Sequence, residues 1–161
     1  MVKYSWHKSE VPADLEIKQV YGIAFSEDNR ILLRIEDGDC KLTGGKPEDG
    51  ESFEDTLKRE YKEELNTELY NIYYLGYLSV EENNSPPYAQ VRMIAKIKRI
   101  NQKTCDPDNG KTYGRKLVCP YNAKKYLKYS DDAGNMMLDD AIMAANENYD
   151  FSVSCTEEIL I

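Results

Sequence analysis

Four residues in one short stretch have the types and the spacing to do chemistry: Arg59, Glu60, Glu63 and Glu64. On a helix the three acids lie within one turn, where like charges repel one another, so something should compensate them. A hard divalent cation does so, because Mg²⁺ takes oxygen ligands and completes its shell with water and substrate phosphates. Arg59 is placed to hold the carboxylates through charge-assisted hydrogen bonds. The spacing therefore predicts a metal site.

A helix expected over residues 52–65 must position these acids. It contains no Gly or Pro, and Ser52 followed by Asp55 resembles a capping box at its start. Its apolar residues recur every four positions and form one stripe that faces a core: Phe53, Leu57, Tyr61 and Leu65. Glu60 and Glu64 fall beside this stripe, with Glu63 at its edge. The acids are therefore expected at the border of the buried face.

A loop with two adjacent glycines precedes the helix. Gly44 and Gly45 are expected to open a turn in which the backbone takes positive φ and approaches a ligand closely. Pro47 and Gly50 continue it as irregular structure. Upstream, residues 16–25 and 31–36 alternate like the two strands of a hairpin, so a sheet delivers the loop and the helix.

Six residues in this stretch match the Nudix box, G-x5-E-x7-R-E-U-x-E-E-x-G-U, in which U is bulky and apolar: Gly45, Glu51, Arg59, Glu60, Glu63 and Glu64. Residues 45–67 thus resemble the Nudix hydrolase family, which includes MutT. Tyr61 stands at the first U position, and Thr67 replaces the last apolar residue. Asn66 replaces the final Gly and suits a left-handed residue that ends a helix. None of these departures removes a carboxylate.

The resemblance implies an α/β fold, a Nudix-type α/β/α sandwich with a mixed central β-sheet. It implies a Mg-dependent hydrolase in which water attacks a phosphorus of a nucleoside diphosphate linked to another group. The implied metal ligands, for Mg²⁺ or alternatively Mn²⁺, are Glu60, Glu63, Glu64 and the carbonyl of Gly44. The implied supporting residues are Glu51 and Arg59, with Gly44 and Gly45 in the loop. Glu60 is the provisional general base, and Glu81 and Glu82 are candidates without positional support.

Other interpretations of the same stretch stay open. The acids could form the solvated face of an ordinary surface helix. A Nudix-like fold could also serve as a nucleotide-binding or regulatory module with weak catalysis, although such modules usually lose glutamates of the box. The isopentenyl diphosphate isomerase branch is disfavoured, because it needs metal-binding histidines and this chain has only His7. A modified nucleoside triphosphate, ADP-ribose and a nucleotide sugar all remain candidate substrates.

Composition bounds the classes of partner. The 161 residues, 41% hydrophobic and 31% charged, predict a single globular domain over residues 1–161. A net charge of −8 argues against nucleic acid and anionic membranes as partners, and leaves a small nucleotide-type substrate met by metal.

The sequence contains no run of about 18 apolar residues, so no membrane span is expected. The N-terminus has no apolar signal region, so reduced cysteines and a cytoplasmic location are expected. A homodimer stays open.

The remaining elements are expected from periodicity. Residues 68–82 and 88–100 are read as strands, the first with a bulge at Gly76. On the second strand Arg92, Lys96 and Lys98 share one face, which is either solvated or meets a phosphate. Residues 106–111 are read as a turn, because they lack the Gly and Glu of a calcium loop. Another strand is expected at 112–119, helices at 120–129 and 136–149, and a closing strand or loose end at 151–161.

Overall fold

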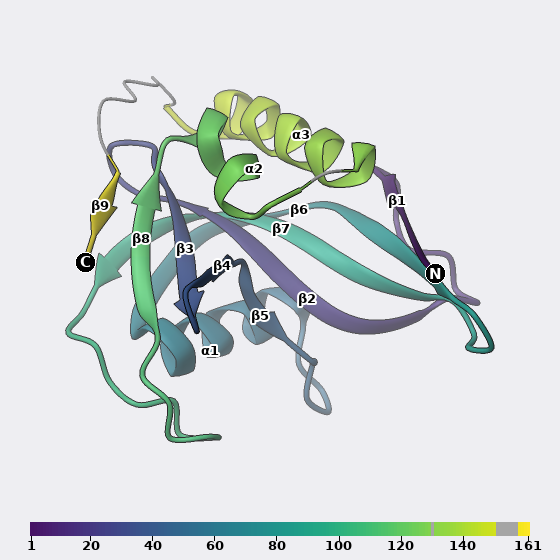
Figure 1. The fold of residues 1–161 in the computed structure, drawn as a ribbon, viewed down its shortest axis with the longest axis horizontal. Coiled ribbons are helices and arrows are strands. Elements are labelled where there is room, and N and C mark those ends of the chain that lie inside the picture. Colours follow the sequence, from purple (N-terminus) through teal and green to yellow (C-terminus); the bar gives the residue numbers. More distant parts are fainter. Residues whose placement is uncertain (130, 151–157) are drawn as a thin grey trace.

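The computed structural model describes residues 1–129, 131–150 and 158–161, which form a mixed sheet with helices on both faces (Figure 1). Its strands are β1 (Val2–His7), β2 (Glu16–Phe25), β3 (Ile31–Glu36), β4 (Asp39–Lys41), β5 (Thr43–Gly45), β6 (Thr67–Glu82), β7 (Tyr88–Ile100), β8 (Gly114–Val118) and β9 (Ile159–Leu160). The order is β1-β6-β7-β2-β3-β8-β9, with β4 paired to β3 and β5 to β2. Strands β2 and β7 run parallel, and the other paired strands run antiparallel.

Helix α1 (Phe53–Leu65) covers one face of the sheet, while α2 (Ala123–Tyr126) and α3 (Asp132–Asn148) cover the other (Figure 1). Two apolar cores result. The first joins Leu57 and Tyr61 of α1 to the sheet, and the second joins Met137 and Ala141 of α3 to its other face. This arrangement confirms the expected α/β/α sandwich with a mixed sheet. None of the helices in the described ranges has both the length and the apolar character needed to cross a bilayer.

Local signals set both ends of α1, as expected. The Ser52 hydroxyl accepts a hydrogen bond of 3.0 Å from the backbone N–H of Asp55, which is the N-cap interaction. Asn66 ends the helix in the left-handed region, with φ 47°. The residue that replaces the box glycine therefore keeps the backbone conformation that ends this helix.

The two glycines of the box differ from the expectation. Gly44 and Gly45 lie in β5, and neither has positive φ, so the prediction of a left-handed turn there was wrong. What they need is space. A Cβ at Gly44 would overlap the backbone of Val20, and one at Gly45 would overlap the carboxylate of Glu60. Close approach, and not backbone conformation, demands glycine at both positions.

Three elements towards the termini were missed or misplaced. Residues 2–7, for which no element was expected, form β1, which pairs with β6 and sends Trp6 Nε1 to Asp140 of α3 at 2.7 Å. Helix α3 begins at Asp132 and not at residue 136, because Asp131 caps it by accepting from the N–H of Gly134 at 3.0 Å. The helix expected at 120–129 is a 3₁₀ turn followed by the four-residue α2. Of the tail expected at 151–161, residues 158–161 are described and contain β9, and 151–157 lie outside the described residues.

Two readings of the basic face of β7 were open, a solvated face or one that meets a phosphate, and the solvated reading was wrong at the centre of the strand. Arg92 is 5% exposed and Lys96 is half-buried, whereas Lys98 is exposed. The reason is that α3 covers this face of the sheet (Figure 1). Among the cysteines, Cys40 and Cys105 are free thiols, but Cys119 is disulfide-bonded, against the expectation of reduced cysteines throughout.

Candidate functional site

Arg59 ties the loop between β5 and α1 to the acids of α1. Its Nε and Nη2 donate to the two carboxylate oxygens of Glu51, at 2.7 and 3.0 Å. Its Nη1 donates to Glu60 at 2.8 Å and to Glu63 at 3.3 Å, and Nη2 also reaches the carbonyl of Lys46 at 3.1 Å. The guanidinium therefore uses its planar fork to hold three carboxylates and the loop backbone in one arrangement.

Glu51 is the residue that orients this arginine. Hydrogen bonding from Arg59, with a further bond from the N–H of Glu48, lowers the pKa of Glu51 to about 2. The hydroxyl of Thr56 donates to the same carboxylate at 3.1 Å. Glu51 is thus ionised and fully engaged by protein groups, which suits a supporting residue.

Glu60 and Glu64 flank the buried stripe and have different partners. The Glu60 carboxylate forms an ion pair with Arg59 and packs against Gly45. Glu64 instead forms an ion pair with Arg34 of β3 at 2.9 Å. The second oxygen of Glu64, Oε2, is buried and has no hydrogen-bond partner among the described residues. Burial raises the pKa of Glu60, and it raises that of Glu64 to about 7. A buried carboxylate oxygen without a donor is the kind of group that a cation would satisfy.

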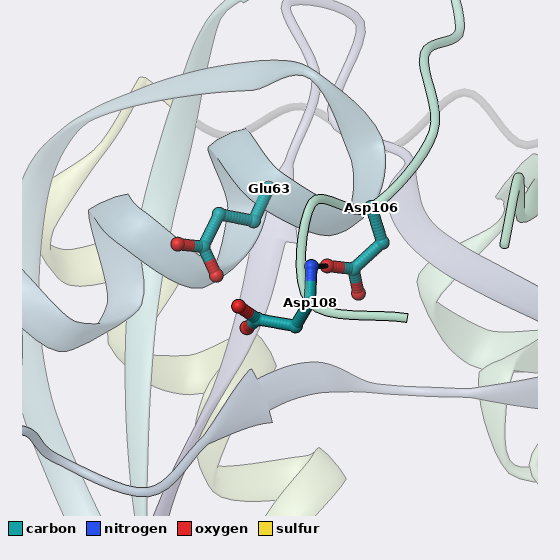
Figure 2. A group of neighbouring side chains, drawn as sticks. All are labelled: Glu63, Asp106 and Asp108. Atoms are coloured by element: carbon teal, nitrogen blue, oxygen red, sulfur yellow. Dashed lines mark hydrogen bonds between the residues drawn. The ribbon is translucent and has the colours of Figure 1, made fainter. Parts of the chain in front are cut away.

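A second acidic segment, which the sequence did not reveal, lies beside Glu63. Asp106 and Asp108, in the loop between β7 and β8, each bring a carboxylate oxygen close to Glu63, and the three ligand atoms lie within 4.8 Å of one another (Figure 2). The loop is held by Asp106 itself, whose Oδ1 accepts from the N–H of Asp108 at 2.9 Å. Burial and the charge of Asp108 raise the pKa of Glu63. Such a cluster is a fitting set of ligands for a hard divalent cation.

The structure therefore brings the expected residues together in two groups. Arg59 joins Glu51, Glu60 and Glu63, while Glu64 is anchored separately by Arg34. The two acids proposed outside the box, Glu81 and Glu82, lie at the end of β6 opposite Lys3 and Val2 of β1, and both are exposed. The sequence DPDNGK indicated a turn at residues 106–111. That its two acids lie beside Glu63 of α1 depends on the tertiary fold and could not be read from this segment.

Replacing Glu51 by Gln is expected to weaken Mn²⁺ binding by about 10- to 100-fold, the usual effect of losing a residue that orients metal ligands. The cause is that Arg59 loses its ionised partner and no longer holds Glu60 and Glu63 in place. Titration calorimetry measures the affinity. Glu54→Gln is the matched control, because Glu54 lies on the same helix and its one ion pair within the described part of the chain is with Lys58. Equal affinities for both variants would contradict the role of Glu51.

The metal-free protein is expected to lose stability as the pH rises from about 4.5 to about 7. The pKa of Glu64 in the folded state is about 7 and its ordinary value is 4.5, so the folded state binds more protons in this window. Stability from the protonated form is complete below 4.5 and is lost as the pH passes the folded pKa. Melting temperatures in chelator should show a smaller decline for Glu64→Gln. Parallel profiles for the two proteins would refute this assignment.

Comparison with known proteins gives a consistent result. The family model of the NUDIX domain matches residues 18–111. No curated protein matches the chain significantly. The structure resembles a mutant of the Bacillus subtilis pyrophosphohydrolase BsRppH, with a TM-score of 0.68 and 22% identity over 88% of this chain and 90% of that one.

Two further solved structures show the same fold. A MutT from Aliivibrio salmonicida or Vibrio cholerae has a TM-score of 0.54 and 17% identity, covering 74% of this chain and 92% of that chain. The Escherichia coli ORF135 protein has a TM-score of 0.57 and 19% identity, covering 85% of this chain and 96% of its own. At these identities the likeness establishes a shared fold.

Proposed function

This chain belongs to the Nudix hydrolase family, and on that premise we propose that it uses Mg²⁺ to hydrolyse a nucleoside diphosphate linked to another group. Water attacks one phosphorus of the diphosphate, and residues 1–161 act as one Nudix domain. The B. subtilis neighbour is named a pyrophosphohydrolase, which is the same class of bond cleavage. The substrate class proposed here is a small nucleotide.

The observation that carries the proposal is the contact of Arg59 with Glu51, Glu60 and Glu63. A solvated acidic face would need no such arrangement, because exposed ion pairs contribute little to stability. Here one half-buried arginine holds carboxylates that would otherwise repel one another, and these carboxylates lie next to β5, which contains the two glycines. Carboxylates held in fixed positions in this way are expected at a site that binds a cation and a phosphate.

The residues proposed to hold the metal are Glu60, Glu63, Glu64 and the carbonyl of Gly44, with Mn²⁺ as an alternative ion. Asp106 and Asp108 are added to this set because of their approach to Glu63. When bound, the ion would lower the pKa of a water molecule and neutralise charge on phosphate oxygens. Arg59 and Glu51 keep the carboxylates oriented, and Gly45 leaves room for Glu60.

We assign Glu60 as the residue that accepts the proton from water. Its Oε1 is held by Arg59, while Oε2 makes no hydrogen bond to a described residue and can act as the acceptor. Arg59 thus orients this carboxylate with one oxygen occupied and one available. Glu81 and Glu82 are not part of this assignment.

A nucleotide panel tests the proposal. Nucleoside triphosphates, ADP-ribose and nucleotide sugars would be incubated with Mg²⁺ in ¹⁸O-labelled water, and the products identified by mass. We expect metal-dependent release of a nucleotide product that carries one ¹⁸O atom, or of a labelled phosphate partner, and no release in chelator. Folded protein that binds nucleotides but releases no product would instead establish a binding module and would refute the hydrolase.

A further inference from the structure

A cleft on the face of the sheet covered by α2 and α3 is lined by residues other than the acids of α1. Two adjoining cavities of about 450 and 250 Å³ form it. We call it the tyrosine cleft; the residues that line both cavities are Tyr4, Gln90, Arg92 and Tyr129. Tyr21 lines the larger cavity and Asp131 the smaller one. Aromatic rings and a few polar side chains from different elements line it, which is the composition of a small-molecule site.

The tyrosine cleft adjoins the catalytic residues through two contacts. Arg34 lines the larger cavity and pairs with Glu64 of α1 at 2.9 Å. Tyr21 lies opposite Gly44 in the pairing of β2 with β5. A molecule that occupies the cleft can therefore extend its phosphates toward Gly44 and the glutamates.

Arg92 is a buried cation that lacks an acidic partner. It is 5% exposed, and no carboxylate of the described residues forms an ion pair with it. Its guanidinium lies over the ring of Tyr21, 4.7 Å from the centroid, and makes two long contacts, from Nη2 to Gln90 at 3.4 Å and from Nη1 to the carbonyl of Val91 at 3.5 Å. The side chain of Tyr129 also interacts with this guanidinium. Among the described residues, the Nε of Arg92 has no hydrogen-bond partner. Burying a cation whose N–H groups lack acceptors lowers the stability of the fold. A ligand that accepts hydrogen bonds from Arg92 would offset this cost.

Asp131 supplies the complementary acceptor in the smaller cavity. Its Oδ1 caps α3 through the N–H of Gly134, and Oδ2 makes no hydrogen bond to a described residue. A phosphate would be repelled by this carboxylate. A neutral ring that presents acceptors toward Arg92 and N–H donors toward Asp131 satisfies both, and the tyrosine rings offer surfaces for stacking.

We propose that the tyrosine cleft binds the base of the substrate and selects guanine over adenine. Arg92 donates to O6 and N7 of guanine, the commonest specific contact of arginine with a base, and Asp131 accepts from its N1–H and N2–H groups. Adenine places an amino group where guanine has O6, so a donor would face Arg92. The proposal rests on the proposed function, because it names the substrate of the same site.

Calorimetric titration in chelator tests base selection without turnover. The probes are GMP, AMP, guanosine and inorganic phosphate. We expect GMP to bind about 10- to 100-fold more tightly than AMP, the discrimination typical of one good bidentate pair, and guanosine to compete with it. Equal affinity for GMP and AMP would overturn the proposal. So would phosphate binding that depends on Arg92, since Arg92 would then recognise a phosphate.

Two variants separate recognition from folding. Arg92→Lys keeps the charge but loses the bidentate fork, and Asp131→Asn keeps a residue that caps helices well while losing the carboxylate. Both should lose the preference for GMP, whereas Arg99→Lys, exposed on the same strand, should keep it. If Arg92→Lys unfolds, Asp131→Asn still decides: a retained preference refutes the base site.

Kinetics distinguishes this proposal from the proposed function. For an active enzyme, Arg92→Lys should raise KM for the guanine substrate with little change in kcat, because base contacts bind ground and transition states alike. A fall in kcat at constant KM would contradict base recognition. If no nucleotide is hydrolysed but GMP is preferred through Arg92, the hydrolase proposal fails and the base site stands.

Discussion

Glu63→Gln is expected to lower Mg-dependent hydrolysis by about 10²- to 10³-fold, the scale of removing one group that stabilises transition-state charge. Glu63 lies where Arg59 from its own helix and Asp106 and Asp108 from a distant loop converge. The neutral amide keeps the size of the side chain but removes the charge that the cation needs. Initial rates at saturating substrate, over a range of Mg²⁺ concentrations, measure the loss.

The same experiment separates a metal ligand from a merely acidic surface. Glu54→Gln removes an identical charge from the same helix, at a position exposed to solvent, and should keep wild-type turnover. Asp108→Asn should share the defect of Glu63→Gln if the loop contributes to the ion, with weaker Mg²⁺ dependence. Wild-type rates for Glu63→Gln would remove the basis for the proposed metal site.

Tyr61→Ala is expected to destabilise the protein by about 3 to 5 kcal/mol, the range for emptying a large aromatic site in a core. Tyr61 is fully buried between α1 and the sheet, and its hydroxyl donates to the carbonyl of Gly22 at 3.0 Å. Losing the ring removes a central packing contact between α1 and the sheet. Urea denaturation followed by circular dichroism measures the change in the free energy of unfolding.

Tyr61→Phe isolates the hydroxyl, and should cost about 1 kcal/mol because one buried hydrogen bond is lost. The exposed Tyr121 is the control: Tyr121→Ala should change stability by less than about 0.5 kcal/mol. Tyr61→Phe should also retain activity, since the ring still seats the helix. If Tyr61→Ala were as stable as Tyr121→Ala, the packing role assigned to this position would be incorrect.

Short-range sequence patterns were sufficient to predict the strands and the helix around the site. The bounds of β2, β3 and β7 and the capped helix α1 agree with the alternation, turn residues and caps of the sequence. These features depend on residues a few positions apart, which the chain order states directly. The Nudix box was readable for the same reason, because all of its residues lie in one loop and one helix.

Contacts between distant segments were not readable in this way. Strand β1 has a mixed sequence and pairs with β6, which is distant in the chain. The start of α3 depends on the cap at Asp131, which the glycine at 134 concealed. The glycines of the box looked like turn residues, yet neighbouring groups from Val20 and Glu60 explain them. Tertiary packing overrode local preference in each case.

The sequence by itself therefore determined the family, helix α1 and the acids at its border. Only the tertiary structure decided what surrounds them: Asp106 and Asp108 beside Glu63, Arg34 on Glu64, and the buried Arg92 of the tyrosine cleft. The physical reason is that helix periodicity and capping act over a few residues. The neighbours of a side chain across a sheet depend instead on strand order and register, which no local spacing records.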